Sequence, residues 1–206
     1  MRNPIIKNSG FTLIEIIIAI SILSGIIFVV SMFGLDIFDL QIFLGDIFVV
    51  QQEITATLTE MGIEVRAMGP SANGSYPVES ASTTSFVYYS DMDGDGSFER
   101  IRYFVVGNVL RKGVIKPVGN PATYPLADEV TRDVVRDLIL PPVADQPLFS
   151  YHDGNYTGTQ EPMSEPVDIN RIRLIKVVIT ADKTPQDNLG RFDYSSLMLI
   201  RNLRNI

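Results

Sequence analysis

The stretch that decides the fold is Gly10-Phe11-Thr12-Leu13-Ile14-Glu15, and it opens an apolar run that continues to Leu35. Glu15 is the only ionisable side chain between Lys7 and Asp36. An apolar stretch of roughly 20 residues is long enough to span a bilayer as a helix. A single acid in such a helix costs about 2.5–3.5 kcal/mol at the centre and less near an end, so Glu15 requires a functional explanation.

The residues ahead of Gly10 form a short basic leader. They include Arg2 and Lys7 and no acid, whereas acids follow the apolar run from Asp36 onward. A secretory signal places its apolar stretch before the cleavage site, so that the stretch is removed. Here the apolar run follows Gly10, and we expect it to remain in the mature protein. The charge asymmetry predicts a cytoplasmic N-terminus and a periplasmic or extracellular C-terminal domain.

The sequence at residues 10–15, with its basic leader and long apolar helix, resembles the processing site of type IV prepilins and of the pseudopilins of type II secretion systems. In that family a prepilin peptidase cuts after the glycine and methylates the new N-terminal phenylalanine. The resemblance implies cleavage between Gly10 and Phe11, methylation of Phe11, and a role for Glu15 in guiding assembly.

Glu15 also has a physical rationale that does not depend on the family. Cleavage would create an α-amine on Phe11, four residues before this carboxylate. An ammonium and a carboxylate attract strongly in a medium of low dielectric constant, and each is costly there when alone. The amine of a neighbouring, staggered subunit could therefore dock on Glu15 and set the register of a filament. The alternative is an ordinary signal anchor whose acid lies near the lipid headgroups.

The apolar pattern continues beyond the membrane-spanning length. We expect residues 1–10 to be the leader peptide, residues 11–35 the transmembrane and assembly helix, and residues 36–66 its amphipathic continuation. No proline interrupts the second segment, and Gly69-Pro70 follows it as a helix stop. Its apolar residues recur at spacings of three and four, the pattern of one helical face. They are Phe43, Ile47, Val50, Ile54, Leu58 and Met61.

Residues 67–206 are expected to form an exported, β-rich globular domain. Gly107-Asn108 is a two-residue turn signal between two of the expected strands. Residues 130–139 have helical spacing, but their branched side chains favour a strand. The other strands are expected at 85–89, 99–106, 109–115, 147–151, 171–181 and 195–203. The predicted fold class is α+β and pilin-like, a long N-terminal helix packed on an antiparallel β-sheet domain.

A second informative stretch is Asp91-Met92-Asp93-Gly94-Asp95-Gly96-Ser97-Phe98-Glu99. Acids at positions one, three and five with glycine at six match the opening of an EF-hand loop. An EF-hand has an acid at position twelve and flanking helices, but here Arg102 stands at that position and strands are expected on both sides. The stretch instead resembles the Asp-x-Asp-x-Asp-Gly calcium loops that lie on β-hairpins, as in integrin-type propellers.

This second resemblance implies a structural Ca²⁺ site. The implied ligands are the carboxylates of Asp91, Asp93, Asp95 and Glu99 and the backbone carbonyl of Ser97. Oxygen donors suit Ca²⁺, and crowded carboxylates repel one another unless a cation or water separates them. The alternative is a solvated acidic hairpin whose glycines supply the turn geometry. We expect no organic cofactor.

The composition excludes several classes of function. The chain has 206 residues, a formal net charge of −7 and no cysteine, so a disulfide cannot stabilise it. It shows no basic patch of the kind that binds nucleic acid. The single histidine, His152, stands at an expected strand end and is typical of a turn or surface residue. We find no Ser/His/Asp set, Cys/His pair or phosphate-binding glycine loop, and so expect no enzymatic activity.

Two classes of function remain. The first is a minor pilin or pseudopilin that joins, primes or caps a type IV pilus or a type II secretion pseudopilus. The acidic hairpin, the Gly107-Asn108 turn and Leu203-Arg204-Asn205 resemble larger minor pilins of the J or W type. The expected partners are prepilin peptidase, other pilin or pseudopilin subunits, the inner-membrane assembly platform and, before assembly, membrane lipid. The second class is a membrane-anchored or tip-located binding or adhesin domain exported by the pilin route.

These expectations fix a location for the chain. It should first be a single-pass protein of the cytoplasmic (inner) membrane, with its N-terminus in the cytoplasm. After cleavage and methylation it should become part of a cell-surface filament, which is a pilus, a competence pilus or a secretion pseudopilus.

Overall fold

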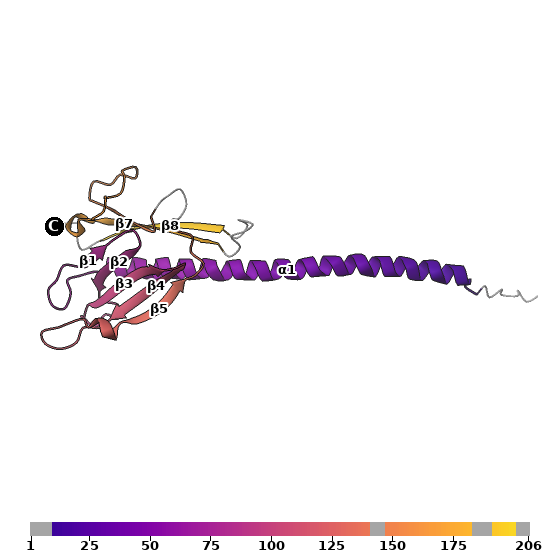
Figure 1. Ribbon diagram of the computed structural model, residues 1–206, viewed down its shortest axis with the longest axis horizontal. Helices are drawn as coiled ribbons and strands as arrows, with labels where there is room; N and C mark the ends of the chain where they lie inside the picture. Colours follow the sequence, from indigo (N-terminus) through magenta and orange to yellow (C-terminus); the bar gives the residue numbers. More distant parts are fainter. Residues whose placement is uncertain (1–9, 141–146, 183–190, 201–206) are drawn as a thin grey trace, which may run out of the picture. The chain divides into compact units, whose positions relative to one another are not determined.

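The computed structural model describes residues 10–140, 147–182 and 191–200. The chain divides into two compact units, Met1–Asp46 and Ile47–Ile206, which are described separately. Residues 1–9 of the expected leader, with Arg2 and Lys7, lie outside the described residues. One 54-residue helix, α1 (Leu13–Arg66), contributes to both units, as the sequence predicted (Figure 1).

From Leu13 to Phe33, α1 exposes apolar side chains around its whole circumference. The segment Leu13–Gly34 has a mean hydropathy of 2.8, and among the described residues it is the one segment long and apolar enough to cross a membrane. The hydroxyls of Ser21, Ser24 and Ser31 each donate a hydrogen bond of 2.8 Å to the carbonyl four residues earlier. Hydroxyls satisfied in this way can lie in hydrocarbon at little cost. The helix therefore has the properties of a membrane anchor.

The second unit contains two antiparallel sheets (Figure 1). The larger sheet has the strand order β1-β2-β3-β4-β5 and the smaller one the order β6-β7-β8. Within each sheet, strands that are consecutive in the sequence pair with one another, which is the simplest antiparallel arrangement. The strands are β1 (Val78–Ala81), β2 (Ser85–Ser90), β3 (Glu99–Val106), β4 (Val109–Ile115), β5 (Val130–Val135), β6 (Phe149–His152), β7 (Leu174–Asp182) and β8 (Arg191–Leu199). Among the described residues, the connections contain the short 3₁₀ helices η1 (Leu126–Asp128) and η3 (Ile169–Arg171).

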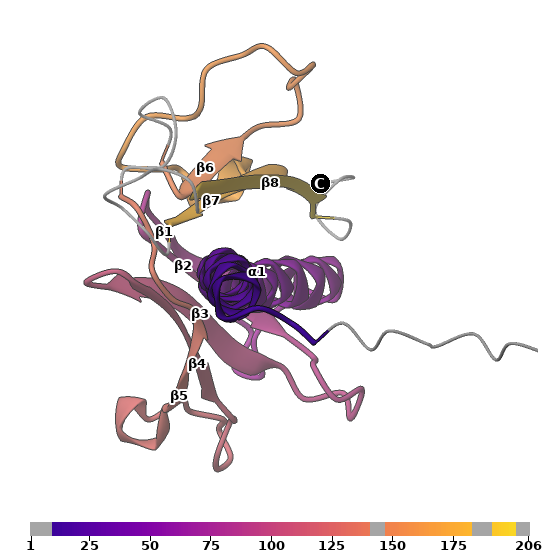
Figure 2. The same ribbon diagram turned by 90° about the vertical axis from the view of Figure 1, so that its right-hand side faces the viewer.

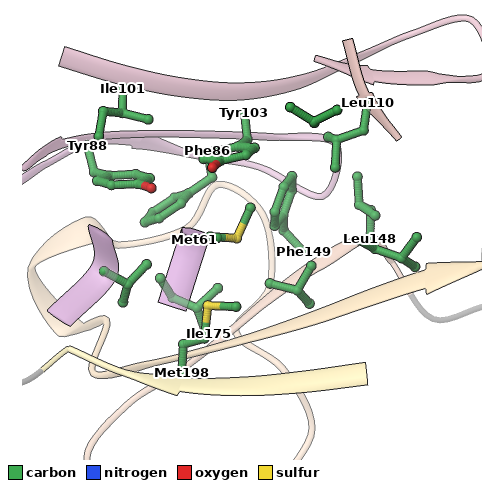
Figure 3. Close-up of a cluster of buried hydrophobic side chains, with 14 of the residues drawn as sticks. Met61, Phe86, Tyr88, Ile101, Tyr103, Leu110, Leu148, Phe149, Ile175 and Met198 are labelled. Carbon is green, nitrogen blue, oxygen red and sulfur yellow. The ribbon is translucent and has the colours of Figure 1, made fainter. Parts of the chain in front are cut away.

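The part of α1 that belongs to the second unit lies between the two sheets (Figure 2). Met61 on this part of the helix is fully buried and lies among Phe86 of β2, Phe149 of β6 and Ile175 of β7 (Figure 3). The expected apolar helix face is thus in the core from Ile47 onward: Ile47, Val50, Ile54 and Met61 are buried, and Leu58 packs at the edge. The side chain of Phe43, also expected on this face, lies outside the described part of the structure. The helix is the central layer that joins the two sheets into one hydrophobic core.

A polar cluster is buried in the same layer. Glu64 of α1 forms an ion pair with Lys112 of β4, and the side chains of both residues are less than 5% exposed. The hydroxyls of Tyr88 and Tyr103 donate hydrogen bonds of 2.8 and 3.0 Å to Glu64 Oε2. Lys112 Nζ also lies 2.8 Å from Oε1 of Glu60. These contacts fix the rotation and register of the helix on the larger sheet.

The structure confirms the α+β class and corrects several element boundaries. The strands expected at 99–106 and 109–115 have the bounds that the sequence indicated, and residues 130–135 form a strand. Strand β1 was not expected, because it has only four residues and Glu79 and Ser80 are exposed. Strand β8 begins at Arg191, ahead of the expected start at Ser195, whereas β6 and β7 begin later than expected. Leu203-Arg204-Asn205 lies outside the described residues.

Candidate processing site and acidic loop

The residues of the expected processing site lie at the start of α1. Gly10 and Phe11 precede the helix and are exposed, with 81% of the Phe11 surface accessible. Thr12 is the residue just before the helix, and its side chain faces Glu15. The backbone N–H of Glu15 donates to Thr12 Oγ1 at 3.4 Å, and the backbone N–H of Thr12 donates to Glu15 Oε2 at 3.3 Å. This reciprocal pair is a capping box, which satisfies two backbone donors at the helix start.

The capping box gives Glu15 a second, local role. The Glu15 carboxylate accepts a hydrogen bond from the backbone N–H of Thr12 in the same chain, and Thr12 Oγ1 also lies 3.5 Å from Glu15 Oε2. A carboxylate in the first helical turn is also favoured by the positive end of the helix dipole. These contacts reduce the free-energy cost of placing the Glu15 carboxylate in the apolar helix, and its oxygens stay accessible to a further hydrogen-bond donor. The Thr-x-x-Glu spacing is the sequence signal from which this cap could have been predicted.

The acidic stretch forms the turn between β2 and β3. Asp91 holds the turn closed, because its Oδ1 accepts from the backbone N–H of Gly94 at 2.8 Å and its Oδ2 from that of Gly96 at 3.0 Å. Both glycines have positive φ angles, +74° and +84°, which favour glycine. Asp95 Oδ1 accepts from the backbone N–H of Ser97 at 2.7 Å. The loop therefore has a defined geometry that depends on the Asp-x-Asp-Gly-Asp-Gly pattern.

The structure brings three of the expected ligands together. Carboxylate oxygens of Asp91, Asp93 and Glu99 all lie within 4.8 Å of one another. This group does not include Asp95, whose carboxylate instead bonds to the Ser97 backbone. Lys116, just after β4, places its Nζ 2.9 Å from Asp93 Oδ2 and 3.8 Å from Glu99 Oε1. The hydrogen bond from Lys116 lowers the pKa of Asp93, and the carboxylates raise that of Lys116.

Lys116 is a member of this cluster that sequence reasoning missed. It lies 17 residues beyond Glu99 in the sequence, and only the pairing of β3 with β4 brings it to the loop. A lysine after a strand gives no local signal of such a contact. The side chain is 67% exposed, so the ammonium can leave the cluster without disturbing the core.

His152 has surroundings that differ from the expected turn or surface position. It is the last residue of β6 and is only 4% exposed, because the ring of Tyr156 covers it at a centroid distance of 4.0 Å. Its Nε2 atom is buried and has no hydrogen-bond partner among the described residues. Burial, together with the charge of Lys176, lowers the pKa of His152. A cavity of about 480 Å³ beside it is also lined by Gln160 and Arg171.

Comparison with known proteins bears on the N-terminal segment. A family model described as the prokaryotic N-terminal methylation motif matches residues 6–24. A search of curated proteins finds no match to the chain. The motif implies processing by prepilin peptidase and assembly with other pilins, and the apolar helix Leu13–Gly34 fits a membrane-anchored pilin. The methylation motif at the head of this helix is consistent with a type IV prepilin-like protein.

Proposed function

We propose that this chain is a minor pilin or pseudopilin, a structural subunit of a type IV pilus or of a type II secretion pseudopilus. Prepilin peptidase removes residues 1–10 and methylates Phe11, and the mature subunit then joins, primes or caps the filament. The observation that carries the proposal is the position of the methylation motif directly ahead of an apolar helix whose single acid is Glu15. In this proposal the chain has a structural role and no catalytic one.

The route to the filament follows from the same residues. Before assembly the subunit is held in the inner membrane by the first part of α1, with its N-terminus in the cytoplasm and the β-rich unit on the other side. The assembly platform then moves it into contact with other subunits. The large β-rich unit, with its acidic hairpin and the Gly107-Asn108 turn, supports a position among the larger minor pilins of the J or W type.

The capping box suggests how Glu15 recognises a neighbour. The N–H of Thr12 and the start of the helix stabilise the carboxylate in the isolated subunit. Cleavage adds a cationic amine at Phe11 of each subunit, and the amine of a neighbouring subunit is a stronger, charge-assisted donor for the same oxygen. Pairing neutralises two charges that would each be costly in an apolar environment, so only the correct axial stagger is favourable.

The test is replacement of Glu15 by glutamine in the native host. Glu15→Gln keeps the shape and the hydrogen bond from Thr12 but removes the charge. We expect the variant to be cleaved and to remain in the membrane but to be absent from sheared filaments, or to stop their formation. Asp128→Asn, which neutralises an exposed acid in η1, is the matched control and should assemble like the wild type. Normal incorporation of Glu15→Gln would contradict the proposed assembly role.

A second candidate is a tip-located binding or adhesin domain that uses the pilin route for export. The cavity beside His152 favours it, because the aromatic ring of Tyr156 and the polar side chains of Asp168 and Arg171 line one recess. Here Arg171→Gln is the informative variant. Loss of surface attachment with normal filaments would support this candidate, whereas unchanged attachment by Arg171→Gln would argue against it.

A further inference from the structure

The acidic loop between β2 and β3 has the dimensions of a calcium site. The nearest carboxylate oxygens of Asp91, Asp93 and Glu99 lie within 4.8 Å of one another. Two oxygens bound to one Ca²⁺ at about 2.3–2.6 Å lie at most about 5 Å apart, so one ion can bind all three oxygens after at most a small movement of the side chains. The three ligands come from positions one, three and nine of the stretch, and the hydrogen bonds that Gly94 and Gly96 donate to Asp91 hold the turn in this form.

Glu99 provides independent support for a ligand at this place. It is 1% exposed, and its Oε2 accepts from the backbone N–H of Met92 at 3.1 Å. Its Oε1 is buried and receives no hydrogen bond in the described part of the chain. The closest cation, Lys116 Nζ, is 3.8 Å away. A buried carboxylate oxygen without a donor is costly, and it requires either a cation or a bound donor.

We propose that Ca²⁺ binds in this loop through the carboxylates of Asp91, Asp93 and Glu99, and that it displaces the ammonium of Lys116 into solvent. Asp95 and the Ser97 carbonyl lie on the same turn and can enlarge the ligand set with a small movement, and water can complete it. The donors are all oxygen, a set that suits Ca²⁺ or Mg²⁺ better than zinc. The irregular loop favours Ca²⁺, which accepts six to eight ligands, over Mg²⁺, which requires a near-ideal octahedron.

The ion would stabilise a junction of several segments. Tyr124 donates to the carbonyl of Phe98 at 2.7 Å and accepts from the backbone N–H of Ala72 at 2.9 Å. The ring of Phe98 packs against Gly69, where a β-carbon would lie only 2.3 Å from the ring. The loop is therefore in contact with the segment that follows α1, and Lys116 connects it to the end of β4. Calcium would fasten this junction, a role that is separate from filament assembly through Glu15.

The test is calcium titration of the full-length protein in detergent micelles after treatment with a chelator. Isothermal calorimetry with CaCl₂ should give one site with a Kd of about 10⁻⁴–10⁻³ M, as is typical of extracellular calcium sites. Thermal unfolding should shift upward with CaCl₂ and less with MgCl₂. Glu99→Gln and the exposed variant Asp93→Asn should each weaken binding at least about tenfold, whereas the control Asp128→Asn should bind normally.

Lys116→Gln separates calcium binding from a general effect of charge. Removal of the competing ammonium should tighten Ca²⁺ binding and lower the melting temperature measured in chelator. The proposal is overturned if the wild type shows neither heat of binding nor a thermal shift at 10-fold the upper Kd. It is equally overturned if Asp93→Asn, which alters an exposed side chain and should fold, binds Ca²⁺ as tightly as Asp128→Asn.

Discussion

Replacement of Lys112 by methionine tests how the helix is held on the larger sheet. Lys112 of β4 is 1% exposed and is paired with Glu64 of α1, which is itself buried. Methionine has a similar length and fills the same space without a charge. Lys112→Met therefore leaves the Glu64 carboxylate buried with only the hydroxyls of Tyr88 and Tyr103 as partners.

The expected loss of stability is large. Removal of one partner of a buried ion pair costs about 3–5 kcal/mol, because the remaining charge is uncompensated. The double variant Glu64→Gln with Lys112→Met removes both charges and keeps an oxygen that can accept from the two tyrosines. It should be more stable than Lys112→Met alone, since no unpaired charge remains. Such a recovery of stability by the second substitution is specific to a buried ion pair and would not arise from a simple loss of packing.

The assay is urea unfolding of the full chain in detergent, followed by near-ultraviolet circular dichroism of the tyrosines. With a slope of about 2 kcal/mol per M, the loss should lower the urea midpoint of Lys112→Met by roughly 2 M. Arg136→Met is the control, and its midpoint should stay close to that of the wild type because this side chain is largely exposed. A midpoint for Lys112→Met near that of the wild type would refute the argument, as would a double variant less stable than Lys112→Met.

Two further predictions concern the tyrosines and the helix cap. Burial and the nearby Glu64 raise the pKa of Tyr88 and Tyr103, so these phenols should stay neutral when exposed tyrosines ionise near pH 10. Because the phenols ionise at a lower pH in the unfolded chain, the free energy of unfolding should be unaffected below about pH 10 and fall above it. An ultraviolet titration in which all tyrosines of the folded protein ionise together would contradict this prediction. Thr12→Val removes the cap and should destabilise the start of α1 by about 0.5–2 kcal/mol, seen as faster amide exchange at Glu15 in micelles. Thr12→Ser should restore protection, and equal exchange in both variants would argue against the capping box.

Much of the fold follows from local patterns in the sequence. The apolar spacing from Ile47 to Met61 without proline predicts a helix with one buried face, and the structure buries that face. The Gly107-Asn108 pair predicts a turn because glycine readily adopts a positive φ. In the structure Gly107 has a φ of +62°. Strands β3 and β4 could be placed on either side of it for the same reason.

Other features depend on contacts between distant segments. In the sequence, Glu64 resembles the other acids that are spaced along the helix. It lies three residues after Met61, however, and is therefore on the buried face. Only the sheet reveals its partner, Lys112. Lys116 reached the acidic loop in the same way, and Tyr156 buried His152 by folding over the end of β6. No local spacing in the sequence encodes these partners.

The central claim is that the apolar helix stays with the mature protein after removal of the leader at Gly10. The most direct measurement is mass spectrometry of the N-terminal peptide of the protein recovered from its native membranes and sheared filaments. The account predicts a peptide that begins at Phe11 with one methyl group on its α-amine, and that is absent from a host without prepilin peptidase. An intact Met1 in the filament fraction, or cleavage after the apolar helix, would contradict it.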